Sequence, residues 1–255
     1  MQHNVYSNTA IKKITKASAI VAQTLSYIEP YVKPGISTAM INDLCHKFIV
    51  DNDARPACLN YRGFPKAVCT SRNDIVCHGI PNADEIVQEG DIINIDLVVE
   101  KDGYMGDASR TFILPSCRQD HIQLVQRCKQ LRDNIIEFLK EGVTLYEIAQ
   151  YSQDYIDSFG YFTTDLYCGH GVGRNLHEDP NIFFAMPSSS QHRKILKSYA
   201  LKHNQVITIE PVINLGTSET YEANDGWTIR TTDGSYSAQW EHTVLITHDG
   251  SRILS

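Results

Sequence analysis

The chain has 255 residues, 42% of them hydrophobic, and a formal net charge of −7 at pH 7. A chain of this size can bury a substantial core as one large domain or two small ones. The sequence contains no long run of acidic or basic residues. The negative charge disfavours sequence-independent nucleic-acid binding and suits a substrate with a positively charged end.

Targeting and disulfide signals are sparse in the sequence. Residues Met1–Tyr6 have no basic segment followed by an apolar one. No apolar run approaches the roughly 18 to 20 residues that a membrane span needs. The seven cysteines are an odd number without a Cys-x-x-Cys pair, which indicates neither a disulfide scaffold nor a zinc ribbon. We therefore expect a protein of the reducing cytoplasm with no membrane partner.

Helical spacing of apolar residues predicts two helices, at 8–29 and 36–52, in the first half of the chain. Two strands are predicted next, at 87–99 and 104–114. Asp102-Gly103 between them is typical of a tight hairpin.

The second half repeats this order. Helices are predicted at about 121–140 and from 141–144 to about 159, with strands from 165 onward. The polar, turn-rich segment 186–194 is expected to form a surface loop. Trp227, in the segment 216–232, is expected either to wall a pocket or to cap the core edge.

Short strings recur between the halves. Pro34-Gly35-Ile36-Ser37 resembles Glu141-Gly142-Val143-Thr144, and Ile93–Asp96 resembles Ile207–Glu210. We interpret this as an internal duplication of about 8–115 and 120–255 within one domain, 1–255. The expected fold class is α/β (α+β), with two pseudo-symmetric halves of antiparallel sheet covered by helices.

Metal-seeking side chains lie in or beside apolar, strand-like runs: Asp96, Asp107, His170, Glu210 and Glu241. A buried carboxylate is costly unless it is protonated, paired with a cation or bound to a metal. The runs that hold Asp96 and Glu210 carry no basic residue. Oxygen ligands with one imidazole suit Mn²⁺, Fe²⁺, Co²⁺ or Zn²⁺. Four carboxylates are better shared by two ions than placed on one.

Each candidate ligand also has an ordinary alternative. Asp96 could pair with Arg110, Glu241 could pair with His242, and Asp107 could cap the hairpin. The matched positions of the five residues in the two halves favour the metal site. His78 and His177 border turn-forming segments, which suggests acids, bases or donors near the metals; a core or surface position is the alternative for His78.

The ordered motifs resemble those of type I methionine aminopeptidases over nearly the whole chain. They are Cys77-His78-Gly79-Ile80-Pro81, Asn94-Ile95-Asp96, Gly106-Asp107, Gly169-His170-Gly171-Val172-Gly173-Arg174, His177-Glu178, Thr208-Ile209-Glu210-Pro211 and Gln239-Trp240-Glu241-His242-Thr243. The resemblance implies the pita-bread fold, in which two pseudo-symmetric halves enclose a site for two divalent ions.

The resemblance also implies a role for each residue. Asp96 would bind one metal, His170 and Glu210 the other, and Asp107 and Glu241 both. Glu210 would serve as general base, His177 would steady the oxyanion, and His78 would contact the scissile nitrogen. The methionine pocket would hold Cys58, Tyr61, Phe64, Cys69, Leu176 and Trp227, beside His78 and His177. Phe64 stands where bacterial members have Tyr, and Leu176 where they have Phe.

The implied activity is removal of the initiator methionine from nascent proteins when the second residue is small. Substrates would be polypeptide N-termini, met through transient contact with the ribosome, and the enzyme would be a monomer. A proline-specific peptidase of the same fold is the nearest alternative. A non-catalytic binding module of this fold is a second one, although the intact ligand set disfavours it.

Overall fold

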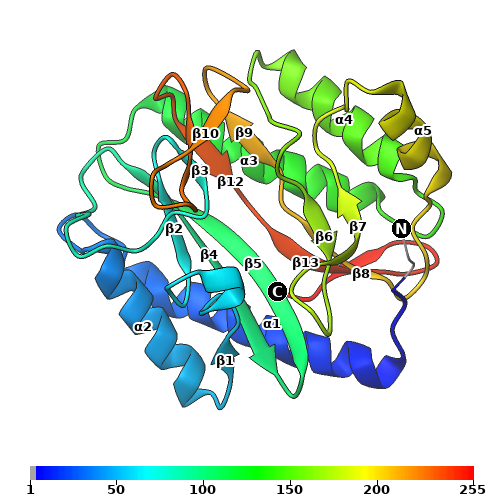
Figure 1. Cartoon of the computed structure of the whole chain (residues 1–255), viewed down its shortest axis with the longest axis horizontal. Coiled ribbons are helices and arrows are strands. Elements are labelled where there is room, and N and C mark those ends of the chain that lie inside the picture. The colour runs from blue at the N-terminus through cyan, green and yellow to red at the C-terminus, as the bar shows by residue number, and fades with distance from the viewer. Residues whose placement is uncertain (1–3) are drawn as a thin grey trace.

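The structure is a computed structural model that describes residues 4–255. Its first half contains two helices, two short 3-10 helices and five strands (Figure 1). They are α1 (Asn8–Ile28), η1 (Glu29–Tyr31), α2 (Thr38–Asp51), β1 (Arg55–Pro56), η2 (Tyr61–Gly63), β2 (Cys69–Arg72), β3 (Ile75–Cys77), β4 (Ile92–Lys101) and β5 (Tyr104–Ile113).

The second half again opens with two helices and continues into strands. Its elements are α3 (Gln119–Phe138), α4 (Leu145–Ser158), β6 (Gly169–Gly171), β7 (Glu178–Ile182), α5 (Ser190–Ser198), β8 (Val206–Ile209), β9 (Val212–Asn214), β10 (Thr220–Glu222), β11 (Ile229–Thr231), β12 (Ser237–Gln239), β13 (His242–Ile246) and β14 (Ser251–Ile253).

Helices α1, α2 and α4 begin at capping residues that the sequence supplies. Ser7 Oγ accepts a hydrogen bond from Ala10 N, and Ser37 Oγ accepts one from Met40 N. Thr144 opens α4 with a reciprocal capping box to Glu147. Each cap satisfies an amide that the helix itself leaves unpaired, so these helices begin within two residues of their predicted positions.

The sheets are antiparallel throughout. One joins β1, β4 and β2, with β5 paired to β4, and a second runs β14-β13-β8-β6-β7. Two smaller sheets have the orders β10-β11-β3 and β12-β9. The predicted hairpin is confirmed: β4 and β5 pair as far as Lys101 with Tyr104, and Asp102 and Gly103 take the positive φ values of a two-residue turn.

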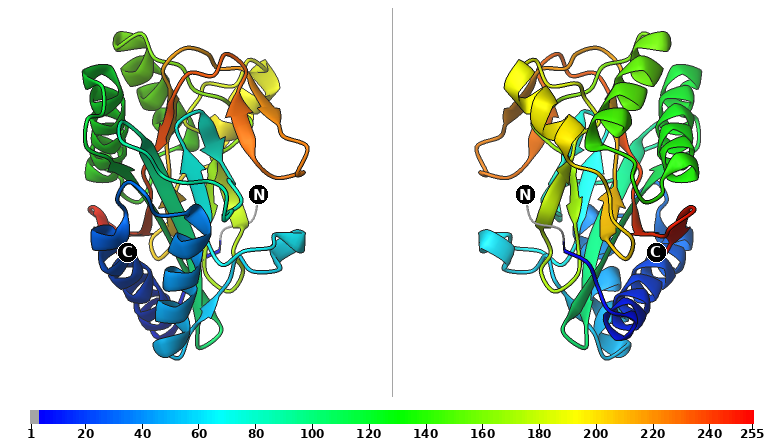
Figure 2. Two further views of the ribbon diagram at one scale, coloured as in Figure 1. Left: turned by 90° about the vertical axis from the view of Figure 1, so that its left-hand side faces the viewer. Right: turned by 90° about the vertical axis from the view of Figure 1, so that its right-hand side faces the viewer.

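Helices α1 to α4 lie along one side of the sheets, while η2 and β10 project on the opposite side (Figure 2). One apolar core, which includes Ile41, Ile95 and Leu97, fills the space between α1, α2 and the β4–β5 hairpin. A second core, which includes Leu131, Ile148 and Ile207, lies between α3, α4 and the larger sheet. Each half therefore covers one face of its sheet with its own helix pair, and the predicted pita-bread arrangement is confirmed.

Three local predictions were wrong. The predicted strand at 87–99 begins at Ile92, because Gly90 has φ +84° and Gln88–Asp91 form a turn. The predicted loop at 186–194 becomes helix α5 from Ser190, capped by Ser189. Residues 165–168, predicted as strand, are three bends and one irregular residue that precede β6.

Among residues 4–255, no helix has the length and hydropathy needed to cross a membrane.

Candidate metal centre and substrate pocket

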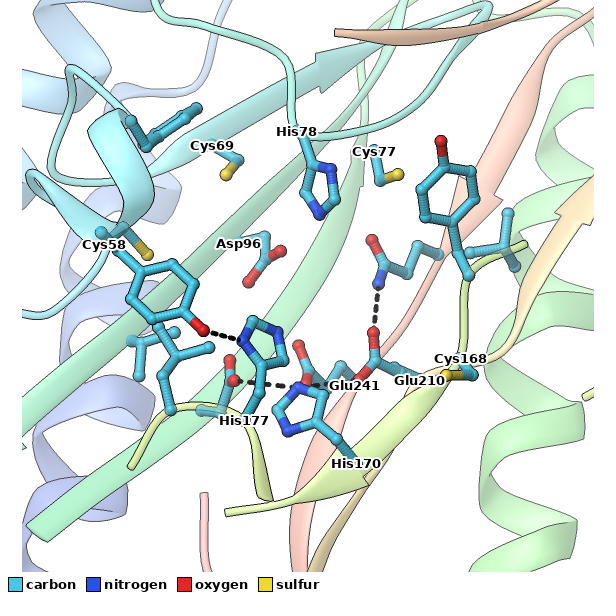
Figure 3. A pocket seen from close by; sticks show the side chains of 18 of the residues that line it. Cys58, Cys69, Cys77, His78, Asp96, Cys168, His170, His177, Glu210 and Glu241 are labelled. Atoms are coloured by element: carbon cyan, nitrogen blue, oxygen red, sulfur yellow. Dashed lines mark hydrogen bonds and ion pairs between the residues drawn. The ribbon is translucent and has the colours of Figure 1, made fainter. Parts of the chain in front are cut away.

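Strand register brings the predicted carboxylates together. Asp96 pairs with Ser109, and Asp107 pairs with Val98, so both carboxylates leave the same face of the β4–β5 hairpin. His242 pairs with Ile209, which sets Glu241 opposite Glu210 at the adjoining ends of β13 and β8. His170 lies on β6, beside β8. The five residues come from both halves and meet in one pocket (Figure 3).

The two halves are joined by hydrogen bonds beside these ligands. Glu241 N donates to Ser109 O at 3.2 Å. Thr243 Oγ1 accepts from Asp107 N at 3.0 Å and donates to Asp107 O at 2.7 Å. These bonds fix β5 against β13, so the carboxylates of the two halves are held at a set distance.

The glycines around His170 allow close backbone approach. A Cβ on Gly169 would lie 2.6 Å from Thr208 O, and one on Gly171 would lie 2.3 Å from Asp179 O. Both distances are shorter than side-chain contacts allow, so only glycine fits the crowded pairing of β6 with its neighbours. The Gly-His-Gly motif thus places the imidazole beside the carboxylates.

The ligand atoms of Asp107, His170 and Glu241 lie within 4.8 Å of one another, and all three residues are buried. His170 Nε2 is 3.7 Å from Asp107 Oδ2 and 3.4 Å from Glu210 Oε1. Asp96 and Glu210 line the same pocket but lie outside this tight group. Figure 3 shows the carboxylates of Glu210 and Glu241 and the imidazole of His170 directed toward a common space, with Asp96 on the β4 side.

None of these carboxylates forms an ion pair with a lysine or arginine of residues 4–255. Arg110, the alternative partner of Asp96, instead holds Glu29 through two bonds of 2.8 and 2.9 Å. His242, the alternative partner of Glu241, faces Ser255 Oγ. Asp107 lies within β5, paired with Val98, and does not cap the turn. The ordinary alternatives for these three residues are therefore wrong.

Burial without a cation raises the pKa of every carboxyl group in the cluster. The pKa of Asp96 rises to about 7 and that of Glu210 to about 8. Burial raises the pKa of Asp107 and Glu241 well above the ordinary range, and the neighbouring carboxylates add to the effect. Such clustering of acids is costly unless a cation shares the space.

The imidazole of His170 is set up as a metal ligand. Burial lowers its pKa to about 4, so the ring is neutral. Nδ1 lies 3.0 Å from Gly171 O, an arrangement that requires the proton on Nδ1. Nε2 then directs its lone pair at Asp107 and Glu210. Metal-binding histidines commonly have their second nitrogen held in this way, and the residues present therefore fit divalent metal ions.

The pocket that holds the carboxylates has a total volume of about 490 Å³. All the residues predicted for the methionine pocket line it: Cys58, Tyr61, Phe64, Cys69, His78, Leu176, His177 and Trp227. Cys58, Phe64, Cys69 and Leu176 are buried in one apolar cluster. The ring of Trp227 meets that of Phe64 edge to face, with centroids 5.1 Å apart. Trp227 is thus a pocket wall.

His177 and His78 face the cavity from opposite sides (Figure 3). Burial lowers the pKa of His177 to about 3, so it is neutral. Tyr61 Oη lies 2.7 Å from His177 Nδ1. A hydroxyl that donates to Nδ1 leaves the proton on Nε2, free to donate to a ligand. His78 is fixed by edge contacts with Tyr167 and Trp227, and burial lowers its pKa as well.

The loop that carries Leu176 and His177 is held by the N-terminal segment. Tyr6 Oη donates a hydrogen bond to Glu178 Oε2, which also accepts from Asn4 Nδ2 at 3.1 Å. Glu178 Oε1 accepts from Asn175 N at 2.9 Å. Tyr6, two positions before α1, thus anchors the backbone next to His177.

Sequence reasoning missed the residues that orient Glu210. Thr208 Oγ1 donates to Glu210 Oε1 at 2.6 Å, and Gln239 Nε2 donates to Glu210 Oε2 at 3.3 Å. Thr208 lies two residues before Glu210, and Gln239 two before Glu241. Strand alternation could have indicated both. Tyr167 and Cys168 also line the cavity, but they lie in a bend without a periodic pattern.

The fold and the buried cluster of four acids and one imidazole define the class of protein, which is a metallopeptidase with the pita-bread fold. The model of metallopeptidase family M24 matches residues 12–248. The methionine aminopeptidase of Buchnera aphidicola (Schizaphis graminum) is 41% identical over 254 residues, which cover 98% of this chain and 93% of that protein.

Solved structures agree with the sequence comparison. The methionine aminopeptidase of Rickettsia prowazekii superposes with a TM-score of 0.93 at 38% identity, covering 99% of both chains. The prolidase of Pyrococcus furiosus has a TM-score of 0.78 at 21% identity, and this chain covers 64% of it. The prolidase therefore shares the fold alone. The chain belongs to metallopeptidase family M24 and, within it, to the methionine aminopeptidases.

Proposed function

We propose that the protein is a metal-dependent aminopeptidase that removes methionine from the N-terminus of polypeptides whose second residue is small. One observation carries the proposal. A cluster of four carboxylates and one neutral imidazole, without a basic partner among the described residues, forms the floor of a cavity with an apolar, thiol-containing wall. The floor suits divalent metals, and the wall suits a polarizable thioether side chain.

Two metal ions are proposed, drawn from Co²⁺, Mn²⁺, Fe²⁺ and Zn²⁺. Asp107, His170 and Glu241 converge tightly enough to contribute to one ion. Asp96 lies outside that group and would serve mainly the other, with Asp107 and Glu241 shared between the ions. Glu210 would join His170. When bound, the ions would polarise the scissile carbonyl and activate the attacking water.

Glu210 would move the protons of the reaction. Its carboxylate would accept a proton as water adds to the carbonyl carbon, then deliver it to the leaving amine as the carbon–nitrogen bond breaks. The bonds from Thr208 and Gln239 support this role, because they hold both carboxylate oxygens in a defined orientation. Proton transfer over hydrogen-bond distances depends on such orientation.

His177 would donate from Nε2 to the carbonyl oxygen, where negative charge develops. The Tyr61 hydroxyl supports this assignment, because its contact with Nδ1 selects the required tautomer. His78, on the opposite side of the cavity, would hydrogen-bond the nitrogen of the scissile bond. Neither histidine needs to be charged for these roles, in keeping with their lowered pKa values.

The side-chain pocket would be formed by the apolar cluster around Cys58, Phe64 and Cys69, closed by Tyr61, Leu176 and Trp227. Leu176 is smaller than an aromatic residue and leaves room on the His177 side. A straight chain ending in a thioether would fill this space better than a β-branched one.

The physiological substrates proposed are N-termini of nascent polypeptides, which the enzyme would meet in the cytoplasm by transient contact with the ribosome. The site is built from one chain, since both halves of the same molecule supply its ligands. This supports a monomeric enzyme.

Substrate specificity tests the proposal. We expect metal-loaded protein to release methionine from Met-Ala-Ser and not to release leucine from Leu-Ala-Ser. Met-Lys-Ser and Met-Phe-Ser should be cleaved poorly. Equal cleavage of the leucine peptide would contradict the assigned pocket. Cleavage restricted to peptides with proline in second place would instead favour a proline-specific peptidase.

A further inference from the structure

A second hollow adjoins the substrate pocket. It has a volume of about 650 Å³ and is lined on one side by residues 161–166 and on another by the start of β10. We call it the acidic trough and define it by Asp157, Phe162, Asp165, Leu166, Glu219 and Thr220. Leu166 lines both the acidic trough and the substrate pocket. The two hollows therefore lie next to each other, with Leu166 at their shared border.

Both walls of the acidic trough lead to the substrate pocket. Beyond Leu166, the first wall continues to Tyr167 and Cys168, which line the pocket beside Glu210. Beyond Thr220, the second wall continues through β10 to Trp227, in the turn before β11. Figure 1 shows β10 beside β3 and β9 in the upper part of the view. A peptide bound at the metal centre could thus extend between these walls.

Leu166 is the most exposed large hydrophobic side chain of residues 4–255, at 67%. Phe162, farther along the same wall, is 41% exposed. Two large apolar side chains exposed along one channel, next to a substrate pocket, suggest contact with a ligand. β10 is an edge strand of the sheet β10-β11-β3, and an edge strand offers backbone groups to an extended peptide.

The charge of the acidic trough selects the kind of ligand. Asp157, Asp165 and Glu219 are exposed, and no lysine or arginine of the described chain lines the hollow. Asp157 accepts a hydrogen bond from Gln153, and none of the three acids forms an ion pair with a described residue. Three uncompensated carboxylates in one concave surface attract cations.

We propose that the acidic trough binds the residues that follow the cleaved bond and favours lysine or arginine among them. The proposal rests on the proposed peptidase function. It names the substrate class more narrowly: polypeptides with a small second residue and a basic segment soon after it. The apolar side chains contact the extended backbone and side-chain stems, while the carboxylates attract the charged ends.

Kinetics test the proposal with three peptides: Met-Ala-Ser-Lys-Lys-Gly and its counterparts with Gln-Gln or Glu-Glu at positions four and five. Values of kcat/KM, normalised to the dipeptide Met-Ala, should fall in the order Lys, Gln, Glu. The range should be about 3- to 10-fold at low salt, the scale of a few exposed charge contacts, and should shrink in about 0.5 M salt.

Variants locate the preference. Asp165→Asn combined with Glu219→Gln should reduce the ratio of the Lys to the Glu peptide to near 1. Glu137→Gln removes one exposed charge from α3, away from the acidic trough, and should keep most of the ratio. A double variant that retains the full ratio would overturn the proposal.

Binding gives a readout that does not need turnover. Titration of the ¹⁵N-labelled protein with Ala-Ser-Lys-Lys-Gly should shift the amide signals of Asp165, Leu166 and Thr220, and the Glu-Glu peptide should shift them less. Shifts confined to other surfaces would refute the acidic trough as the binding site. Methionine release without any charge preference would do the same and leave the proposed function standing. Trough shifts without methionine release would overturn the proposed function alone.

Discussion

At the residue scale, the central feature is the burial of negative charge without a compensating cation. The pKa values of Asp96 and Glu210 rise to about 7 and 8 because burial disfavours their charged forms. In most proteins an arginine or lysine would relieve this cost, but here Arg110 is engaged by Glu29. Bound metal ions would take that place, and ligation would keep the carboxylates ionised.

Substitutions should separate metal binding from transition-state stabilisation. Glu210→Ala should lose metal and activity together, because it removes a proposed ligand. His177→Ala should keep its metal but lower kcat by about 10²-fold, as loss of one oxyanion donor does. Elemental analysis and peptide kinetics on the same preparations check both. A matching loss of metal in His177→Ala would contradict the role given to that residue.

The metal-free protein should lose stability as pH rises from 7.0 to 8.5. The folded state keeps protons on the raised carboxyl groups, whereas the unfolded chain has already released them at its ordinary values of 3.8 and 4.5. The folded state therefore binds more protons, and the free energy of unfolding falls with pH. Unfolded histidines are mostly neutral in this range and contribute little.

Thermal melts at both pH values, with and without Mn²⁺, measure this effect. Buried thiols such as Cys45, whose pKa is raised to about 12, also lower stability toward alkaline pH, but they do so whether or not metal is present. The difference between the two series therefore isolates the carboxylates. If the melting temperature of the metal-free protein rose from pH 7.0 to 8.5, the raised pKa values of Asp96 and Glu210 would be excluded.

At the element scale, short segments far apart in sequence hold the reactive side chains. The loop 172–177 carries Leu176 and His177, and Tyr6 and Asn4 anchor its end through Glu178 at the start of β7. A Cβ on Gly173 would lie 2.1 Å from Tyr6 Oη, so glycine is required where the tyrosine passes. Asn4 and Tyr6 thus support the position of His177, although neither of them lines the cavity.

Tyr6→Phe should lower kcat by about 3- to 10-fold with little change in KM, since losing one charge-assisted hydrogen bond costs about 1 to 2 kcal/mol. Tyr146→Phe is the matched control, because it also removes a hydroxyl bond, here to Gln150 on the surface of α4. Equal effects of the two substitutions on kcat would show that the anchor has no specific role.

Local sequence patterns predicted much of this arrangement. The Asp-Gly turn and the strand alternation in β4 and β5 placed Asp96 and Asp107 correctly, because both depend only on neighbouring residues. Helix α5 was missed because its segment is polar and turn-rich, although Ser189 caps a helix there. The start of β4 was predicted too early because the turn at Gly90 interrupts the apolar run before Ile92. The hydrogen bond from Tyr6 to Glu178 joins residues that are 172 positions apart in the sequence. No periodic pattern in the sequence predicts such a contact.

At the scale of the whole molecule, the two halves form one site only because their strands are joined. Thr243, fully buried on β13, both accepts from and donates to the backbone of Asp107 on β5. Glu241 N binds Ser109 O two residues farther along β5. Stability of the interface and geometry of the metal centre are therefore linked through the same residues.

Thr243→Val should destabilise the protein by about 1 to 3 kcal/mol, because it leaves the buried N–H and C=O of Asp107 without partners. Thr24→Val is the control: the Thr24 hydroxyl donates to Ile20 O inside α1, where the helix already uses that carbonyl. Denaturant unfolding of both variants gives the comparison. A cost for Thr24→Val as large as that for Thr243→Val would argue against the interface role.

Titration of metal-stripped protein with Mn²⁺, while free methionine is measured from Met-Ala-Ser, tests the central claim most directly. We predict no release without metal and a rate that rises in step with metal occupancy, measured on the same samples by calorimetry. Release at the full rate from metal-free protein, or none once metal is bound, would contradict the account.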